Sequence, residues 1–381
     1  MYSLYIHIPF CKQACHYCDF HFSTTLKRKT ELIEALCKEL ILRRQEAVHS
    51  ELQTIYFGGG TPSLLTSNEL EKIMDTIYQH YKVSEKAEIT LEANPDDFSN
   101  QGNLSLSFEK IKQLKINRLS IGIQSFFEED LQLMNRAHTA WQAQTILQEA
   151  STFFDNITID LIYGIPNMSN DRWIKNIQKA LDAGVPHISA YALTVEPRTA
   201  LEKLIHKGKI PHINEEQTYE QFFLLKNILE EKNFIHYELS NFGKEGYFSK
   251  NNTAYWEQKP YMGIGPSAHS YNGKERSWNI SHNIKYIQAI SANIRPCETE
   301  KLSIYDSYNE LILTGLRTQK GISLVQIESL FGKEFHSHLL REANNYLQEE
   351  LLLIDNKHLK TTNKGIFLSD GIASNLFIMP D

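Results

Sequence analysis

Cysteine is scarce in this chain, with five residues in 381, and three of the five lie within eight positions. An odd number with this clustering does not support a disulfide framework, and in a reducing compartment it indicates a metal site or a catalytic cluster. The chain also lacks any run approaching the roughly 20 apolar residues of a membrane-spanning helix. Its first residues, MYSLYIHIPF, lack the basic and apolar regions of a secretion signal, so we expect a cytoplasmic location.

An excess of positive charge is absent too, because 39 Lys and Arg residues face 46 Asp and Glu residues, giving a net charge of −7. This balance argues against a surface built mainly for phosphate backbones, so we expect no nucleic-acid partner, although a local basic patch would still be compatible with it. The chain has no low-complexity segment and no solenoid-type repeat. Its length predicts two or three domains with a large core.

Six short apolar runs alternate with longer helical patterns up to about residue 195. Each run is rich in β-branched or aromatic residues and ends at Gly, Pro or polar turn residues, which predicts strands. The predicted strands are 3–8, 54–59, 87–93, 118–123, 157–164 and 187–193. Helical patterns between them include 28–44 and 67–81, the second with Ser67 as its expected N-cap.

Six strand–helix repeats predict an α/β fold with a parallel sheet, which one-handed crossovers curl into a barrel or part of one. An open, doubly wound sheet is the competing arrangement; in either, functional groups gather at the carboxyl ends of the strands. We expect residues 1–210 to form the partial barrel, 211–300 to complete it and link onward, and 301–381 to form a small helical domain. The segment LLLIDNKHLKTTNKGIFLSD predicts two short strands around a turn, like the wing of a winged helix.

The cysteine cluster follows the first predicted strand: Cys11, Cys15 and Cys18 have the spacing C-x3-C-x2-C. Such thiolates suit zinc or an iron–sulfur cluster. An iron–sulfur cube on three thiolates leaves one iron open to an exchangeable ligand, and Phe20 occupies the position where a fourth cysteine could sit. A structural zinc site instead needs a fourth protein ligand. The nearby histidines are candidates for it: His7, His16 and His21.

Glycines and polar residues accumulate at the ends of the later strands. FGGGTPS follows the second strand, where glycines let the backbone approach a ligand and their N–H groups can meet a carboxylate or phosphate; a tight turn stopped by Pro62 is the alternative. A charge inside an apolar strand, as at Asp160, is costly unless paired or ligand-bound. With three other polar residues it is expected to satisfy one charged ligand: Glu92, Gln124 and Arg136.

Seven ordered motifs carry a resemblance that covers almost the whole chain: YIHIPFCKQACHYCDF, FGGGTPS, LEANP, GIQSF, DLIYGIP, YELSNF and GIGPSAHSY. Together they resemble the radical S-adenosylmethionine (SAM) superfamily and, within it, the oxygen-independent coproporphyrinogen III oxidase-like family, closest to its heme chaperone branch. The resemblance implies an incomplete (β/α)6 radical-SAM barrel followed by a small helical, winged-helix-like C-terminal domain. In that superfamily the open iron chelates SAM, and one electron from the cluster breaks a carbon–sulfur bond.

The resemblance also implies roles for individual residues. A 4Fe-4S cluster would be held by Cys11, Cys15 and Cys18. The implied SAM contacts, with Tyr17 near the adenine, are Tyr5, Tyr17, Gly59, Gly60, Thr61, Glu92, Gln124, Arg136, Asp160 and Ala192.

Two features separate the branches of that family. The decarboxylases resemble C-x3-C-x2-C-x-C and carry an N-terminal arm; here the fourth position is Phe20, and the first strand begins almost at Met1, so no arm is expected. Both features favour a protein that binds heme and passes it to an acceptor, such as a respiratory heme protein, with an electron donor serving the cluster. The alternative function is oxidative decarboxylation of coproporphyrinogen III to protoporphyrinogen IX.

One motif departs from the chaperone pattern His-Asn-x-x-Tyr-Trp, whose histidine is implicated in heme binding. The matching stretch is NNTAYW, with Asn251 in place of that histidine, and an amide is a poor iron ligand beside an imidazole. Either this chain binds heme weakly or not at all, or another residue ligates the iron. The candidates are His236, Tyr255 and His269.

Overall fold

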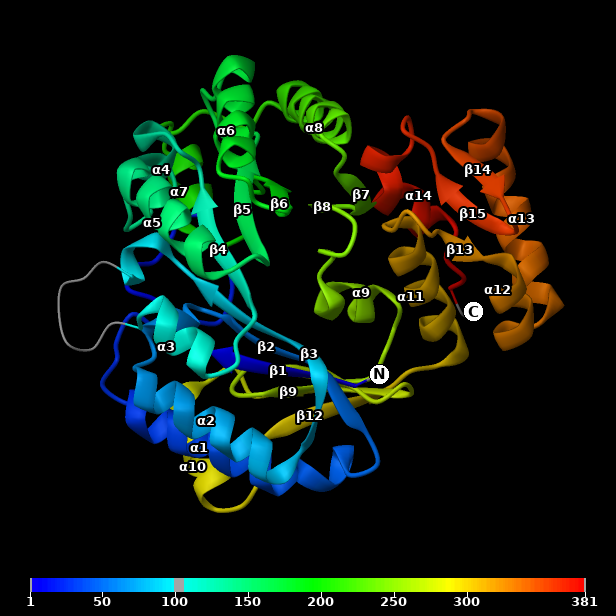
Figure 1. Ribbon diagram of the computed structural model, residues 1–381. Helices are drawn as coiled ribbons and strands as arrows, with labels where there is room; N and C mark the ends of the chain where they lie inside the picture. The colour runs from blue at the N-terminus through cyan, green and yellow to red at the C-terminus, as the bar shows by residue number, and fades with distance from the viewer. Residues whose placement is uncertain (1, 99–105, 380–381) are drawn as a thin grey trace.

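The computed structural model describes residues 2–98 and 106–379 (Figure 1). Six parallel strands follow one another in sequence order through the main sheet, each hydrogen-bonded to the next. This order excludes the doubly wound alternative, in which the strand order reverses at a switch point. The six strands are β1 (Tyr2–Ile8), β2 (Glu51–Gly59), β3 (Lys82–Ala93), β4 (Arg118–Gln124), β5 (Ile157–Tyr163) and β6 (His187–Ala192).

Helices cover the outside of this curved sheet (Figure 1). Their apolar faces and the strands bury one continuous core. The helices of this part are α1 (Lys29–Arg43), α2 (Ser67–His80), α3 (Phe108–Gln113), α4 (Glu128–Leu133), α5 (Ala140–Phe153), α6 (Asn170–Asp182), α7 (Ala200–His206) and α8 (Glu215–Glu231), with short 3-10 turns η1 (Arg44–Ala47), η2 (Pro62–Leu64) and η3 (Pro95–Asp97).

The N-terminus of α2 differs from the prediction. Thr66, not Ser67, is the N-cap, because the Thr66 hydroxyl accepts a hydrogen bond from the Glu69 amide (3.3 Å) and the Glu69 carboxylate accepts one from the Thr66 amide (2.7 Å). This reciprocal pair is a capping box. The predicted assignment was wrong by one residue because Thr66 and Ser67 are both good N-caps, and only the reciprocal partner distinguishes them.

Later segments extend both ends of the sheet to twelve strands. β8 (Asn241–Gly243) pairs antiparallel with β6, and β7 (Ile235–Glu238) pairs antiparallel with β8. At the other end, β9 (Tyr261–Ile264) pairs parallel with β1. The outer strands and the two helices between them are α9 (Lys250–Trp256), β10 (His269–Tyr271), β11 (Glu275–Asn279), α10 (Asn283–Ser291) and β12 (Cys297–Lys301). Cys297 is the first residue of β12, and Cys37 is buried in α1.

A buried ion pair ties α1 to these outer strands. The Arg43 guanidinium donates to the Glu39 carboxylate (3.1 Å) and to the Gly263 carbonyl (2.6 Å). Glu39, with no exposed surface, also accepts from the Gly265 amide (2.9 Å) and the Tyr286 hydroxyl (2.5 Å). The network joins elements more than 200 residues apart and positions the outer strands beside β1.

The C-terminal part has its own hydrophobic core and a three-stranded sheet. Its hairpin confirms the two predicted short strands. It lies against β7 through backbone hydrogen bonds, from the Leu239 amide to the Arg317 carbonyl (2.8 Å) and from the Gln319 amide to the Tyr237 carbonyl (3.0 Å). Its elements are α11 (Ile304–Leu316), β13 (Ile322–Ser323), α12 (Leu324–Phe331), α13 (Lys333–Gln348), β14 (Leu352–Asp355), β15 (His358–Thr361), η4 (Ile366–Leu368) and α14 (Ser369–Asn375).

No helix in the described ranges has the length and apolar character needed to cross a bilayer.

Candidate functional site

A cavity of about 160 Å³ lies at the carboxyl ends of β2 to β5, beside the loop that follows β1. It gathers nearly all the residues that the sequence assigned to the cluster and to SAM: Cys11, Cys15, Tyr17, Cys18, Gly59, Gly60, Thr61, Glu92, Gln124, Arg136 and Asp160. Two predicted residues are placed elsewhere. Tyr5 lines a neighbouring cavity, and Ala192, at the end of β6, lines neither of these cavities.

The cysteine loop is held in place from two sides. At its start, the Cys11 amide donates to the Ser23 carbonyl (3.1 Å). In its middle, the His16 amide donates to the Met134 carbonyl (3.0 Å), and the Asn135 side chain donates to the Ala14 carbonyl (2.7 Å). These contacts fix the loop against the segment after α4, so the thiols face the cavity without a disulfide.

Arg136 links the cysteine loop to the sheet. Its guanidinium donates to the Cys15 sulfur (3.3 Å), to the Tyr17 hydroxyl (3.4 Å) and to the Gly122 carbonyl (3.0 Å). Its Nε atom is buried and has no hydrogen-bond partner among the described residues. An unsatisfied buried donor beside a cavity is satisfied when a polar ligand enters, so this residue fits a SAM site.

The thiols themselves are half-buried. Burial raises the pKa of the Cys11 thiol to about 11, and it raises the pKa of Cys18 as well. Iron ligation removes these protons, because the thiolate is the ligand.

A structural zinc site would need a fourth protein ligand, and the three candidate histidines are placed elsewhere or already hydrogen-bonded. His7 and His21 line the neighbouring cavity, and the His16 ring donates from Nδ1 to the Leu133 carbonyl (2.8 Å). Within residues 2–98 and 106–379, no three His, Cys, Asp or Glu side chains are gathered closely enough to hold a single metal ion. Thiols spread around one cavity suit a cluster whose irons each take a different thiolate.

Two carboxyl groups form the inner wall of the cavity. Glu92 accepts from the Tyr56 hydroxyl (2.8 Å) and from the Gly59 amide (3.1 Å). Burial raises the pKa of Glu92 to about 7, with the Asp160 charge adding to the shift. Burial likewise raises the pKa of Asp160 to about 6, while the Ser189 hydroxyl and the Arg136 charge act in the opposite direction. A cationic ligand would stabilise both groups in their charged forms.

We therefore expect SAM binding to weaken in acid. SAM carries a sulfonium charge, so its attraction is complete when Glu92 and Asp160 are ionised, above pH about 7, and falls as they take up protons. The affinity for SAM should drop about tenfold between pH about 8 and about 6. The Glu92→Gln variant should bind SAM more weakly at pH about 8, and its affinity should depend less on pH. Calorimetric titration of the cluster-loaded protein measures this. The control is Glu71→Gln, on α2 outside the cavity, whose side chain is half-exposed. An unchanged profile in Glu92→Gln would contradict the prediction.

The glycine motif acts differently from the expectation. The amides of Gly59, Gly60 and Thr61 already donate within the chain, to the Glu92 carboxylate, the Ile8 carbonyl and the Phe10 carbonyl. The Gly59 amide therefore meets a carboxylate, as predicted, but the carboxylate belongs to the chain itself, and the three amides are not free to bind an anionic ligand. The motif instead holds the end of β2 against the segment that leads from β1 into the cysteine loop.

Gly59 is required by its backbone angle and by its neighbour. It has a φ of +106°, and a Cβ atom there would lie 2.4 Å from the His7 ring. We expect Gly59→Ala to lower the free energy of unfolding by about 1–3 kcal/mol more than Gly246→Ala, which shares a positive φ (+85°) but has open space around it. Denaturant unfolding of both variants measures the difference. Equal losses would contradict the proposed steric clash.

Asn94 is a site residue that the sequence reasoning missed. Its side chain donates to the Thr61 hydroxyl (3.0 Å) and accepts from the Arg136 guanidinium (2.5 Å), so it joins the glycine motif to the arginine. The signal was present, since Asn94 lies in the quoted motif LEANP. Gln124, in contrast, was predicted, and it adopts a positive φ of 63° at the end of β4, a strained conformation typical of functional sites.

A larger cavity, of about 590 Å³, adjoins the cysteine-lined one, and Phe20 lines both. Its volume lies in the range of small-molecule sites, about 300–1,000 Å³. Strand β1 contributes Tyr5 and His7, and α9 contributes Asn251 and Tyr255. The other lining residues come from β1, the cysteine loop, the outer strands and the loops beside them. The remaining lining residues are Ser3, His21, Lys259, Tyr261, Ser267, His269 and Arg276.

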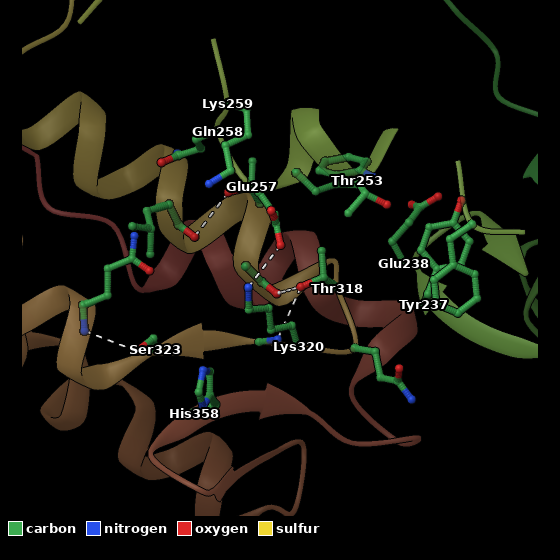
Figure 2. A pocket seen from close by; sticks show the side chains of 18 residues that line it. Tyr237, Glu238, Thr253, Glu257, Gln258, Lys259, Thr318, Lys320, Ser323 and His358 are labelled. Atoms are coloured by element: carbon green, nitrogen blue, oxygen red, sulfur yellow. Dashed lines mark hydrogen bonds and ion pairs between the residues drawn. The ribbon is translucent and has the colours of Figure 1, made fainter. Parts of the chain in front are cut away.

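A third cavity, of about 320 Å³, lies between α9 and the C-terminal part (Figure 2). Polar side chains from both parts surround it, and Lys320 pairs with Glu257 across it (3.1 Å). Trp256 lines this cavity, whereas Asn251 and Tyr255 line the larger one, so α9 separates the two. His358 is the histidine among its lining residues.

Residues 5–180 match the model of the radical SAM superfamily, and residues 302–368 match that of the HemN C-terminal domain. Among curated relatives, the heme chaperone HemW of Bacillus subtilis (strain 168) is 33% identical over 98% of both chains. HemW of Lactococcus lactis subsp. lactis is 32% identical over 100% of this chain and 98% of the relative.

The fold has a solved counterpart. Coproporphyrinogen III oxidase (HemN) from Escherichia coli superimposes with a TM-score of 0.84, covering 99% of this chain and 90% of the other at 21% identity. That likeness concerns the fold, and it confirms the partial barrel with its C-terminal domain. Membership of the superfamily implies a 4Fe-4S cluster and SAM. From the full-length similarity to the HemW proteins, the chain belongs to the radical SAM superfamily and, within it, to the HemN-like family that includes them.

Proposed function

We propose that this protein is a heme chaperone, which binds heme and transfers it to an acceptor protein. The observation that carries the proposal is the similarity to B. subtilis HemW, named a heme chaperone, over 98% of both chains. The cavity of about 590 Å³ supports it, since it offers room for a large planar ligand beside the cysteine site.

The proposed cofactors are a 4Fe-4S cluster on Cys11, Cys15 and Cys18 and SAM at the open iron. When bound and reduced, the cluster supplies one electron to its exchangeable ligand. The chain's own contribution is electrostatic and positional. Arg136 fixes the Cys15 sulfur and offers its unsatisfied Nε to the ligand, while Glu92 and Asp160 face the cationic part of SAM.

Asn94, Thr61 and Arg136 form one hydrogen-bonded chain along the cavity wall. This chain holds the arginine in position whether or not a ligand is present, so binding requires little reorganisation. Phe20 lines both this site and the larger cavity, so it lies where the two adjoin.

A heme titration tests the function. The reconstituted protein is titrated with hemin and followed at the Soret band, and then mixed with apomyoglobin as a generic acceptor. We expect saturable binding and transfer of the heme. Absence of saturable binding would overturn the chaperone function. An anaerobic assay with coproporphyrinogen III is the companion measurement, and formation of protoporphyrinogen would instead support the decarboxylase function.

A further inference from the structure

The three groups that could replace the motif histidine as a heme ligand lie in different environments. His236 lies on β7 and is buried. Its ring stacks on Phe242 (centroids 4.2 Å apart), and its Nε2 donates to the Leu239 carbonyl (3.1 Å). It lines none of the cavities described above. His236 therefore has no free nitrogen facing a ligand site, and its role is structural.

His269 and Tyr255 both line the larger cavity, together with Asn251. His269 lies on β10 opposite Trp278 of β11, and the two rings stack with centroids 5.8 Å apart. Neither ring nitrogen of His269 forms a hydrogen bond within the described ranges.

Of the other histidines of this cavity, His7 is hydrogen-bonded through both ring nitrogens and His21 through one. The His7 ring donates through Nε2 to the His21 carbonyl (3.0 Å). Its other nitrogen, Nδ1, is hydrogen-bonded to the Tyr5 hydroxyl (3.2 Å). The His21 ring is bonded through Nε2 to the Asn283 side chain (2.7 Å). Both rings hold the cysteine loop against β1 and α10. Among the described residues that line the cavity, His269 is thus the imidazole with both nitrogens available.

We propose, on the basis of the heme role above, that heme occupies this cavity and that His269 is its axial iron ligand in this chain. The remaining lining residues fit the rest of the molecule. Aromatic side chains of Tyr255 and Tyr261 provide faces for the porphyrin, and the cations Lys259 and Arg276 match its propionates. Lys259 forms no ion pair within the described ranges, whereas Arg276 also pairs with Glu310 (2.9 Å).

The position of Asn251 agrees with this assignment. Its side-chain oxygen accepts a hydrogen bond from the Thr54 hydroxyl (3.2 Å), and its backbone N–H donates one to the Glu88 carboxylate (3.2 Å). The residue therefore anchors α9 to the sheet. It nevertheless lines the same cavity as His269. The loss of the motif histidine therefore leaves the ligand site in place and moves the iron ligation to another element of the same wall.

The test compares hemin binding by the full-length, cluster-reconstituted protein and three variants: His269→Ala, Tyr255→Phe and His358→Ala. His358 lines the cavity in Figure 2 and serves as the matched histidine control. We expect His269→Ala to weaken hemin binding about tenfold or more and to change the Soret and electron-paramagnetic resonance signatures, with His358→Ala close to wild type. Tyr255→Phe keeps the aromatic ring and removes only the hydroxyl, so it tests ligation by a tyrosinate. Added imidazole should restore the wild-type spectrum in His269→Ala, which a loss of folding would not allow.

The outcomes separate this inference from the function on which it rests. If wild type binds hemin and His269→Ala binds it equally well with the same spectrum, His269 is not the ligand and the inference fails alone. If Tyr255→Phe produces the loss instead, the axial ligand is a tyrosinate. If wild type shows no saturable binding, the chaperone function itself fails. Circular dichroism and SAM binding of each variant report on its folding.

Discussion

Replacing Cys15 by alanine is expected to abolish the iron–sulfur cluster. Three thiolates hold the proposed cluster, and the Cys15 sulfur accepts a hydrogen bond from the Arg136 guanidinium (3.3 Å). Removing Cys15 therefore leaves the cluster with two protein ligands and leaves Arg136 without this acceptor. Iron and sulfide bound after anaerobic reconstitution should fall from a full complement to nearly none. SAM binding should be lost with them, since the open iron is its proposed anchor.

The other cysteines provide the control for that experiment. Cys37 is buried in α1 and Cys297 is exposed at the start of β12, and neither lines the cysteine cavity. Cys297→Ala should retain the wild-type iron content and spectrum. A Cys15→Ala protein that kept its iron, or a wild-type protein that took up zinc in place of iron under oxygen exclusion, would contradict the cluster assignment.

Glu39→Ala should lower the free energy of unfolding by about 3–5 kcal/mol, because removing one partner of a buried ion pair leaves the other without compensation. Glu39 has no exposed surface, and Arg43 would keep only its bonds to the Gly263 carbonyl and to side chains such as Glu46. The Tyr286 hydroxyl and the Gly265 amide would also lose their acceptor. Denaturant unfolding followed by circular dichroism measures the loss.

Glu34→Ala is the matched control on the same helix. The Glu34 side chain is 63% exposed and pairs loosely with Lys72 (3.6 Å), so its removal should cost no more than about 1 kcal/mol. Losses of similar size in the two variants would show that the buried network contributes little. We also expect Glu39→Ala to weaken hemin binding, since the network positions the outer strands that form one wall of the larger cavity.

The inner strands were predictable because their signals are local. Each of β1 to β6 contains an apolar run closed by turn residues. Successive strands pair in sequence order, so the order of the parallel strands could be predicted from the repeated strand–helix pattern. The outer strands were not predictable in this way. β9 pairs with β1 through Ser3 and Tyr261, far apart in sequence, and β12 is a polar strand whose five residues are all exposed. No hydrophobic periodicity marks such a strand.

The site was predicted in its residues more than in their contacts. Residue type and position at strand ends placed Glu92, Gln124 and Asp160 around one cavity, where the structure has them. The sequence did not reveal that the glycine amides are already bonded, nor that Asn94 links Thr61 to Arg136. Those facts depend on which of several nearby donors reaches an acceptor, and that is decided by tertiary packing rather than by spacing.

Phe20 stands in the wall shared by the cysteine cavity and the histidine-bearing one, with 69% of its side chain exposed. A flat macrocycle seated on the far side would have a single benzyl group between itself and the cube. The two groups would then be neighbours, and we expect the oxidation level of the cargo to be linked to that of the cube. Loading and release of the cargo would then respond to the redox state of the cell.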